Sequence, residues 1–413
     1  MNKKQIYNLD NLMILLILSI FCFPSELRVG LLGRVGLINY MAIIIILSII
    51  VKYTKRIKIQ YIVIIFTIQT YYLFSSFFYE KSLSDIILVS TSFIIPLLII
   101  FINVNESEFK KIFYNLLIVL NVITISIVLI GVIEYLFNIN IMMYLSKIMS
   151  PRIHELLSMR NSNEVYRMYS FMGHPLFNTE IILMFYVLNN IYSKYYKTIL
   201  NNNLVALISL IGIALTASKT GLILIILSLL FLNYKKFGLK RIILCILIFF
   251  IIIKSGIFNN TINRFLEGGL TTGRESMWIR LQEYDWFPIK FFTGYGNNFT
   301  FIYNNYMSWA SAAFEYPFRK LALEHGVFIT LLEYIPILLY PIITLIKRRN
   351  VFLLTSYLIL FVDVNTYNGL ALNGDYMLIF CLFIFIIINM SKVLLCRKDT
   401  SKDEDSFSNS QYI

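Results

Sequence analysis

Long apolar segments, repeated along most of the chain, are the feature that most limits how this protein can fold. A helix needs roughly 20 apolar residues to cross the hydrocarbon core of a bilayer, and segments near that length recur as far as residue 396. Of the 413 residues, 58% are hydrophobic and only 14% are charged, whereas soluble domains carry about 25% charged residues. The chain is therefore predicted to be an integral membrane protein.

The apolar segments predict an all-α, polytopic membrane bundle of about 12 transmembrane helices. The predicted spans are residues 11–26, 35–51, 60–79, 84–103, 113–137, 175–193, 203–218, 220–234, 241–257, 326–346, 351–367 and 375–396. Only the polar sequence "TASKTG" separates the seventh span from the eighth, which indicates a helical hairpin with Lys219 at its turn. The bundle is expected to comprise residues 1–397, and the polar residues 398–413 are expected to form a disordered cytoplasmic tail.

The distribution of Lys and Arg predicts how the bundle is oriented. Alternate short loops carry basic clusters such as "KYTKRIK" and "KRR", and the opposite short loops hold only Arg28, Arg34, Lys81 and Lys219. Loops rich in Lys and Arg face the cytoplasm, so both termini are expected to be cytoplasmic. This asymmetry explains the net charge of +13 without a nucleic-acid partner.

Two outer segments, about 138–174 and 258–325, are too long and polar to be simple connectors, and such loops are usually functional. Both are expected to be partly helical. Their arginines are Arg152, Arg160, Arg167, Arg264, Arg274, Arg280 and Arg319. The guanidinium group pairs bidentately with phosphate, so this set predicts binding of a lipid-linked phosphate or pyrophosphate. The alternative is that these arginines are solvated loop residues.

The first outer segment leads into the sequence "RMYSFMGHPLFNTE", residues 167–180. Arg167 is predicted to contact an anion, and Gly173 allows close approach of the backbone. His174 can belong to the same site, or it can simply mark the start of the next helix, where proline is well tolerated. Glu180 would lie inside a membrane helix, where a carboxylate is costly unless it faces a cavity or a cation.

The second outer segment ends in "FEYPFRKLALEHGVF". Glu315 and Arg319 are four residues apart and could form an ion pair within one helix. Alternatively, Glu315 is a general base that takes a proton from a sugar hydroxyl. Lys219 likewise has two interpretations, an anion-binding residue or a lysine that extends to the membrane interface. With three histidines and no HExxH motif, no metal site is expected.

Five segments, in this order, resemble the O-antigen ligase and Wzy-type polysaccharide polymerase superfamily: "RMYSFMGHP", "TASKTG", "RESMW", "GYGNNF" and "LALEHG". They fall between Arg167 and Gly326. The resemblance implies a GT-C-like glycosyltransferase of the bacterial inner membrane whose active site is on the outer face. Such an enzyme transfers glycan from undecaprenyl pyrophosphate with inversion, and it uses no nucleotide sugar, metal or other cofactor.

The resemblance also implies roles for individual residues. The expected catalytic residues are Glu315, Arg274 and Lys219, and the expected substrate-binding residues are Arg167, His174, Arg280 and Arg319. Lys219 and Arg274 would hold the pyrophosphate. The expected partners are an undecaprenyl-pyrophosphate-linked oligosaccharide, membrane lipids and a chain-length regulator protein.

Three functions remain open at this point. Ligases carry a histidine where this chain has Glu315, which favours a repeat-unit polymerase of O-antigen or capsule. A ligase that transfers glycan to a distinct acceptor is the first alternative. The second is a polysaccharide flippase or transporter, although such proteins usually place charged groups near the bilayer midplane. Asp363, predicted near the outer end of its span, is expected to face the same cavity as the outer arginines.

Overall fold

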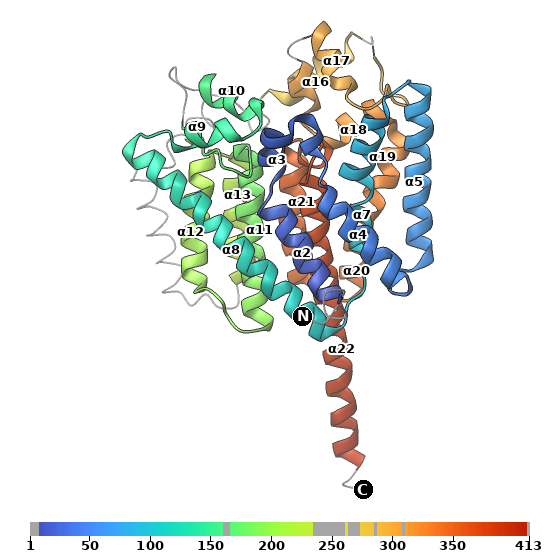
Figure 1. Ribbon diagram of the computed structural model, residues 1–413. Helices are drawn as coiled ribbons and strands as arrows, with labels where there is room; N and C mark the ends of the chain where they lie inside the picture. The colour runs from blue at the N-terminus through green and yellow to red at the C-terminus, as the bar shows by residue number, and fades with distance from the viewer. Residues whose placement is uncertain are drawn as a thin grey trace.

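The computed structural model describes residues 8–159, 166–233, 261–262, 273–284, 287–307 and 310–410. Within these ranges the chain is helical, and its sole extended pairing is an isolated bridge between Ser170 and Gly173. Long helices form a bundle, and short helices gather at one end of it (Figure 1). The prediction of an all-α fold is confirmed for the described part of the chain.

The bundle contains nine continuous helices and two interrupted ones in the described ranges. The continuous helices are α2 (Leu9–Phe21), α4 (Tyr40–Tyr53), α5 (Ile59–Phe78), α8 (Glu106–Phe137), α11 (Pro175–Tyr195), α12 (Asn202–Thr216), α13 (Lys219–Asn233), α21 (Val351–Thr366) and α22 (Tyr376–Ser410). A π-helical turn interrupts each of the others, which are α6 (Leu83–Val89) with α7 (Leu97–Ile100), and α19 (Val327–Tyr334) with α20 (Tyr340–Lys347).

Five of these helices are long and apolar enough to cross a membrane, which supports a membrane-embedded helical protein. They cover Ile59–Phe78, Leu83–Ile100, Glu106–Phe137, Val327–Lys347 and Tyr376–Arg397. A sixth is added if α2 and the following Ser25–Leu37 segment, which are bent by 67°, are counted as one span. Among the predicted spans that these helices do not cover, all but one coincide with a shorter or less apolar helix. The exception, 241–257, lies outside the described residues, and the total of about 12 spans stays a prediction.

The short helices lie opposite the end of the bundle where α2 begins and where α22 extends beyond it (Figure 1). They are α3 (Ser25–Leu32), η1 (Gly33–Leu37), α9 (Ile141–Leu145), η4 (Ser146–Ile148), α10 (Pro151–Met159), α16 (Arg274–Gln282), α17 (Phe299–Tyr306), η6 (Ala310–Phe314), α18 (Pro317–His325) and η8 (Gly369–Ala371). The two long polar segments therefore meet at one end of the molecule.

The segment predicted as a disordered tail is helical in the structure as far as Ser410. It continues α22 without a break, and extending an existing helix avoids the cost of nucleating a new one.

Helix α11 lies at the centre of the bundle and packs against α8, α12, α13 and α21. Its side chains are buried almost throughout, and they include Asn178, Glu180 and Asn189. Asn189 donates to Asn121 of α8 over 2.7 Å. Polar groups are costly in contact with lipid, so a helix that carries this many of them is stable in the interior, where other helices supply hydrogen-bond partners.

The α12–α13 pair forms the predicted hairpin. Helix α12 ends at Thr216, Ala217 adopts a left-handed conformation with φ of 51°, and α13 begins at Lys219. Lys219 thus lies at the turn, as predicted.

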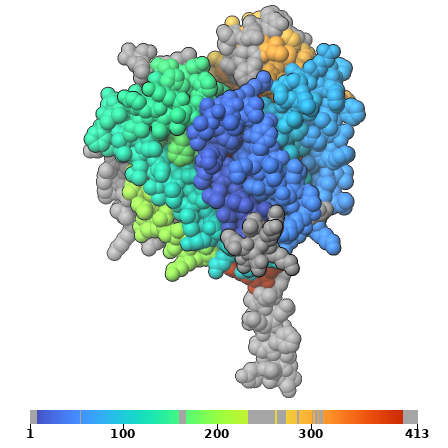
Figure 2. Space-filling view, in the orientation of Figure 1, coloured from blue at the N-terminus to red at the C-terminus, as the bar shows by residue number. Residues whose placement is uncertain are grey.

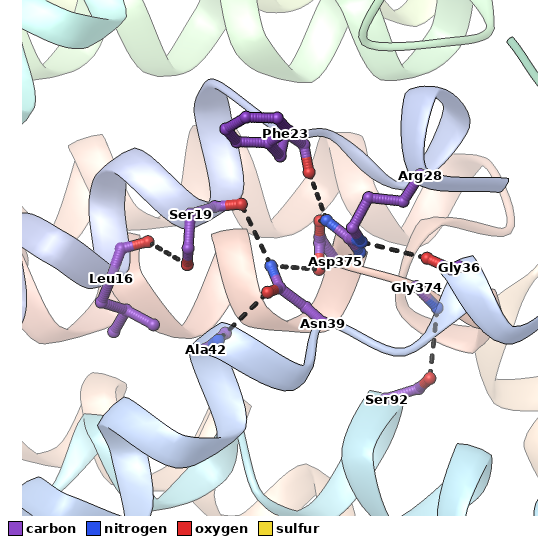
Figure 3. Close-up of polar contacts among 10 residues, drawn as sticks. All are labelled: Leu16, Ser19, Phe23, Arg28, Gly36, Asn39, Ala42, Ser92, Gly374 and Asp375. Carbon is purple, nitrogen blue, oxygen red and sulfur yellow. Dashed lines mark hydrogen bonds and ion pairs between the residues drawn. The ribbon is translucent and has the colours of Figure 1, made fainter. Parts of the chain in front are cut away.

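Arg28, predicted to lie in a short loop, lies in the short helix α3 and is buried in an ion pair with Asp375 (Figure 3). The guanidinium donates to the two carboxylate oxygens over 2.8 and 3.0 Å, and its Nε donates to the Gly36 carbonyl over 3.0 Å. Asn39 also donates to Asp375, over 3.3 Å. Because Asp375 directly precedes α22, these bonds fix α3 and the start of α22 against each other.

Loss of this ion pair is expected to destabilise the protein strongly. Arg28→Ala leaves a buried carboxylate without its main partner, which typically costs about 3–5 kcal/mol. Arg34→Ala is the matched control, because Arg34 pairs with Asp85 while its side chain is 71% exposed, and exposed pairs contribute at most about 1 kcal/mol. Thermal unfolding of the purified protein in detergent should show a much larger decrease for Arg28→Ala. Equal decreases would contradict the structural role given to Arg28.

Candidate functional site

A cavity of about 300 Å³ lies among the short helices. It is lined by Glu26, Arg152, Ile153, Leu156, His174, Leu176, Phe177, Thr300, Phe314, Glu315, Lys320, Tyr367, Asn368, Leu372 and Tyr376. These residues come from α3, α10, the start of α11, the α17–α18 region, the chain between α21 and α22, and the start of α22. On the face shown in Figure 2, the dark-blue N-terminal helices adjoin the green atoms of α8–α10, and the orange atoms of the second outer segment lie above them.

Two cations line the cavity, Arg152 from α10 and Lys320 from α18. Lys320 is only 4% exposed, and its ammonium donates to the carbonyl of Ala371 over 2.7 Å. An ammonium group carries three donors and no acceptor, and this bond fixes the group beside the cavity. An anion in the cavity would meet one cation from each outer segment.

Glu315 also lines the cavity and forms an ion pair with Arg274 of α16. Arg274 additionally donates to the carbonyl of Thr366 over 3.0 Å, so it connects the second outer segment to the end of α21. The side chain of Glu315 remains 42% exposed. The carboxylate is therefore held in position while it stays accessible.

The predicted alternative of a Glu315–Arg319 ion pair within one helix is wrong. Pro317 is the first residue of α18, so Glu315 lies before the helix. The four-residue spacing that brings side chains together within a helix therefore does not apply to Glu315 and Arg319. Arg319 instead pairs with Glu275 over 2.6 Å and lies 4.6 Å from the ring of Trp278. Arg319 thus joins α18 to α16 and is not among the residues that line the cavity.

His174 marks the start of α11 and also lies at the cavity. It is the N-cap residue of α11, and its Nδ1 accepts a hydrogen bond from the backbone N–H of Leu176 over 3.3 Å. It also lines the cavity. The cap fixes the ring at the cavity wall, so the motif positions a side chain there as well as starting the helix.

Arg167 and Lys219 both lie at the α12–α13 turn rather than at the cavity. The Nε of Arg167 donates to the carbonyl of Thr216 over 3.3 Å, and the adjacent Met168 N–H donates to Leu215 over 2.8 Å. Lys219 is 6% exposed at this turn. Arg280 is exposed on α16, and none of these three residues lines the cavity. Of the predicted site, Glu315 and His174 line the cavity, and Arg274 adjoins it through Glu315.

A chain of contacts links the α12–α13 turn to the cavity. The hydroxyl of Thr179 donates to that of Thr216 over 3.0 Å. The next residue, Glu180, accepts a hydrogen bond from the Tyr367 hydroxyl, and Tyr367 lines the cavity. The other oxygen of Glu180 is buried without a hydrogen-bond partner. Asp363 is also buried and does not line the cavity, contrary to the prediction.

Several residues of the cavity were not predicted from the sequence, including Glu26, Tyr367, Asn368 and Tyr376. Each lies at the end of a predicted span, where polar and aromatic residues are common at a membrane interface. Glu26 carried a usable signal, because it is an acidic residue at the edge of the first apolar segment. Nothing in the sequence indicated that the first and last spans would meet near residue 174.

His325 does not line the cavity. Burial, reinforced by Lys320 and Lys81, lowers its pKa to about 3, so the imidazole is neutral at physiological pH. Its ring lies 4.4 Å from that of Tyr72. It therefore stabilises the packing of α18 against α5.

No family model matches the chain, and no curated protein matches it. Within the described residues, no group of three His, Cys, Asp or Glu side chains is placed to hold a metal ion. The family resemblance therefore stays a prediction from the five motifs.

The hydrogen bond from Tyr367, which lines the cavity, to Glu180 is expected to stabilise the folded protein. Tyr367→Phe leaves both carboxyl oxygens of a buried Glu180 without a partner, a loss of about 1–3 kcal/mol. Adding Glu180→Leu removes the orphaned acceptor and should restore most of the thermal stability lost in Tyr367→Phe. Independent, additive losses in the double variant would contradict this coupling.

Proposed function

We propose that this protein is a polysaccharide polymerase that transfers glycan from undecaprenyl pyrophosphate to a sugar of another lipid-linked unit. The observation that carries the proposal is the cavity itself. It joins His174, from the first motif, to Glu315 and Lys320, from the segment before the last motif. Arg274, from the third motif, holds Glu315. Polar and charged residues that are far apart in the sequence thus line one cavity.

The reaction can be assigned to groups at this cavity. The oxygen of the acceptor hydroxyl attacks the anomeric carbon, and Glu315 takes the hydroxyl proton. The bond from that carbon to the pyrophosphate oxygen breaks with inversion, and polyprenyl pyrophosphate leaves with the bonding electrons. Positive groups near the leaving oxygen stabilise the charge that develops on it.

Lys320 and Arg152 are the cations best placed to contact the pyrophosphate, because both line the cavity. Arg274 acts beside them and also orients Glu315. The other predicted site cations do not line the cavity; they are Arg167, Lys219, Arg280 and Arg319. We propose that Arg167 and Lys219 act indirectly, by holding the turn at Thr216, which contacts α11 through Thr179. His174 contacts the substrate from the opposite outer segment.

Transfer is tested with the purified protein and the lipid-linked oligosaccharide that accumulates in the native host when this protein is absent. A polymerase given only this substrate should produce a ladder of lengthening chains. A ligase would produce nothing until its separate acceptor is added, and a flippase would move the substrate across a vesicle membrane without lengthening it. A product of unchanged length in every condition would refute the proposal.

Arg274→Ala and Arg167→Ala are expected to abolish chain growth while membrane insertion is retained. Arg274 loses its contact with Glu315, and Arg167 loses its contact with the Thr216 turn. Lys347→Ala is the control and should form normal ladders, because Lys347 is an exposed cation at the end of α20 and does not line the cavity. Normal ladders from both arginine variants would contradict the roles given to them.

Glu315→Gln is expected to lower turnover about 10²–10⁴-fold, the contribution typical of a general base, with a much smaller change in substrate binding. Single-turnover kinetics on the lipid-linked oligosaccharide would separate the two quantities. An unchanged turnover would remove Glu315 as the base.

A further inference from the structure

A second carboxylate, Glu26, lines the cavity together with Glu315. It lies in α3, directly after the bend that follows α2. This part of the chain is outside the segments that resemble known glycosyltransferases, and the reaction as assigned above gives Glu26 no role.

Neighbouring groups hold Glu26 at the cavity wall. The hydroxyl of Ser150, which precedes α10, donates to Oε2 of Glu26. On the other side lies Gly173, where an added Cβ would be 3.3 Å from Cγ and 3.5 Å from Oε1 of Glu26. Gly173 has φ of 128°, in the region that favours glycine. The absence of a side chain at the glycine of the "GHP" motif thus leaves room for the side chain of Glu26.

The two carboxylates differ in their surroundings. Glu315 is bound to Arg274, whereas Glu26 accepts a hydrogen bond from Ser150 and also interacts with Tyr376 and with the charge of Arg152. Aromatic side chains of Phe177 and Tyr376 line the same cavity. Ionised carboxylates accept several hydrogen bonds, and aromatic rings provide apolar surface with a polar edge. A sugar ring, with hydroxyl groups on its rim and C–H groups on its faces, fits this combination.

We propose that Glu26 binds the hydroxyl groups of the acceptor sugar and so orients the attacking hydroxyl toward Glu315. This proposal rests on the polymerase function. It divides the cavity into an acceptor subsite at α3 and a pyrophosphate subsite at Lys320. Glu26 contacts the substrate, and Glu315 remains the proton acceptor.

Two probes separate these subsites. The free oligosaccharide, released from its lipid by mild acid, has lost the pyrophosphate leaving group and can therefore only accept. Polyprenyl pyrophosphate without sugar is the second product and reports on the pyrophosphate subsite through its inhibition constant. Lipid-linked oligosaccharide at a fixed concentration serves as the donor.

Glu26→Gln is expected to raise the KM for the free oligosaccharide by about tenfold or more, because a charge-assisted hydrogen bond is replaced by a weaker one. The inhibition constant of polyprenyl pyrophosphate should change less than about twofold, because the proposal assigns Glu26 no contact with the phosphates. Gly173→Ala should reproduce the rise in KM by displacing Glu26. Glu155→Gln, the same change at an exposed residue of α10 outside the cavity lining, is the control and should leave both quantities unchanged.

Equal changes in both constants, or an unchanged KM, would overturn the acceptor role. Direct binding of the free oligosaccharide, measured on wild-type protein and Glu26→Gln, tests the sugar site independently of transfer. If the wild type binds the oligosaccharide, Glu26→Gln does not, and no transfer occurs at all, the polymerase function fails and the sugar site stands. If both proteins bind it equally, the sugar site fails.

Discussion

The cost of burying a charge in a membrane protein governs how this molecule is built. A charged group inside a bilayer is expensive and needs a partner or a cavity. Arg28 and Asp375 satisfy each other in the interior, and Glu180 has Tyr367 as its hydrogen-bond partner. Other charged groups lie at the end formed by the short helices, where Arg152, Lys320, Glu26 and Glu315 line a cavity. The same requirement therefore bears both on the packing of the bundle and on the location of the charged cavity.

The Arg28–Asp375 pair also connects the architecture to the site. It fixes α3 against the start of α22, and each of these elements contributes a residue to the cavity, Glu26 and Tyr376. Helix α3 and the start of α22 thus form one wall. The second outer segment forms another wall, where Arg274 connects Glu315 to the end of α21. Arg28, Asp375 and Arg274 do not line the cavity themselves. Their substitution is nevertheless expected to change its shape, because their ion pairs position the walls.

Much of the architecture could be predicted from the sequence. The apolar segments gave the helices of the bundle, and "TASKTG" gave the hairpin turn at Lys219, because length and local polarity determine these features. The pairing of Glu315 with Arg274 could not be predicted, since it depends on how segments 41 residues apart meet. The ion pair of Arg28 could not be predicted for a similar reason: its partner, Asp375, is 347 residues away in the sequence. The position of Glu26 beside Gly173 likewise follows from packing between distant helices.

The central claim is that this cavity holds the pyrophosphate of a lipid-linked glycan, and photocrosslinking tests it most directly. A photoreactive polyprenyl pyrophosphate, with the reactive group beside the phosphates, would be irradiated with the protein in lipid nanodiscs and the labelled peptides identified. The account predicts labelling around Arg152, His174 and Lys320, reduced by excess unlabelled polyprenyl pyrophosphate. Labelling confined to the opposite end of the bundle, or to the outer faces of helices away from the cavity, would contradict it.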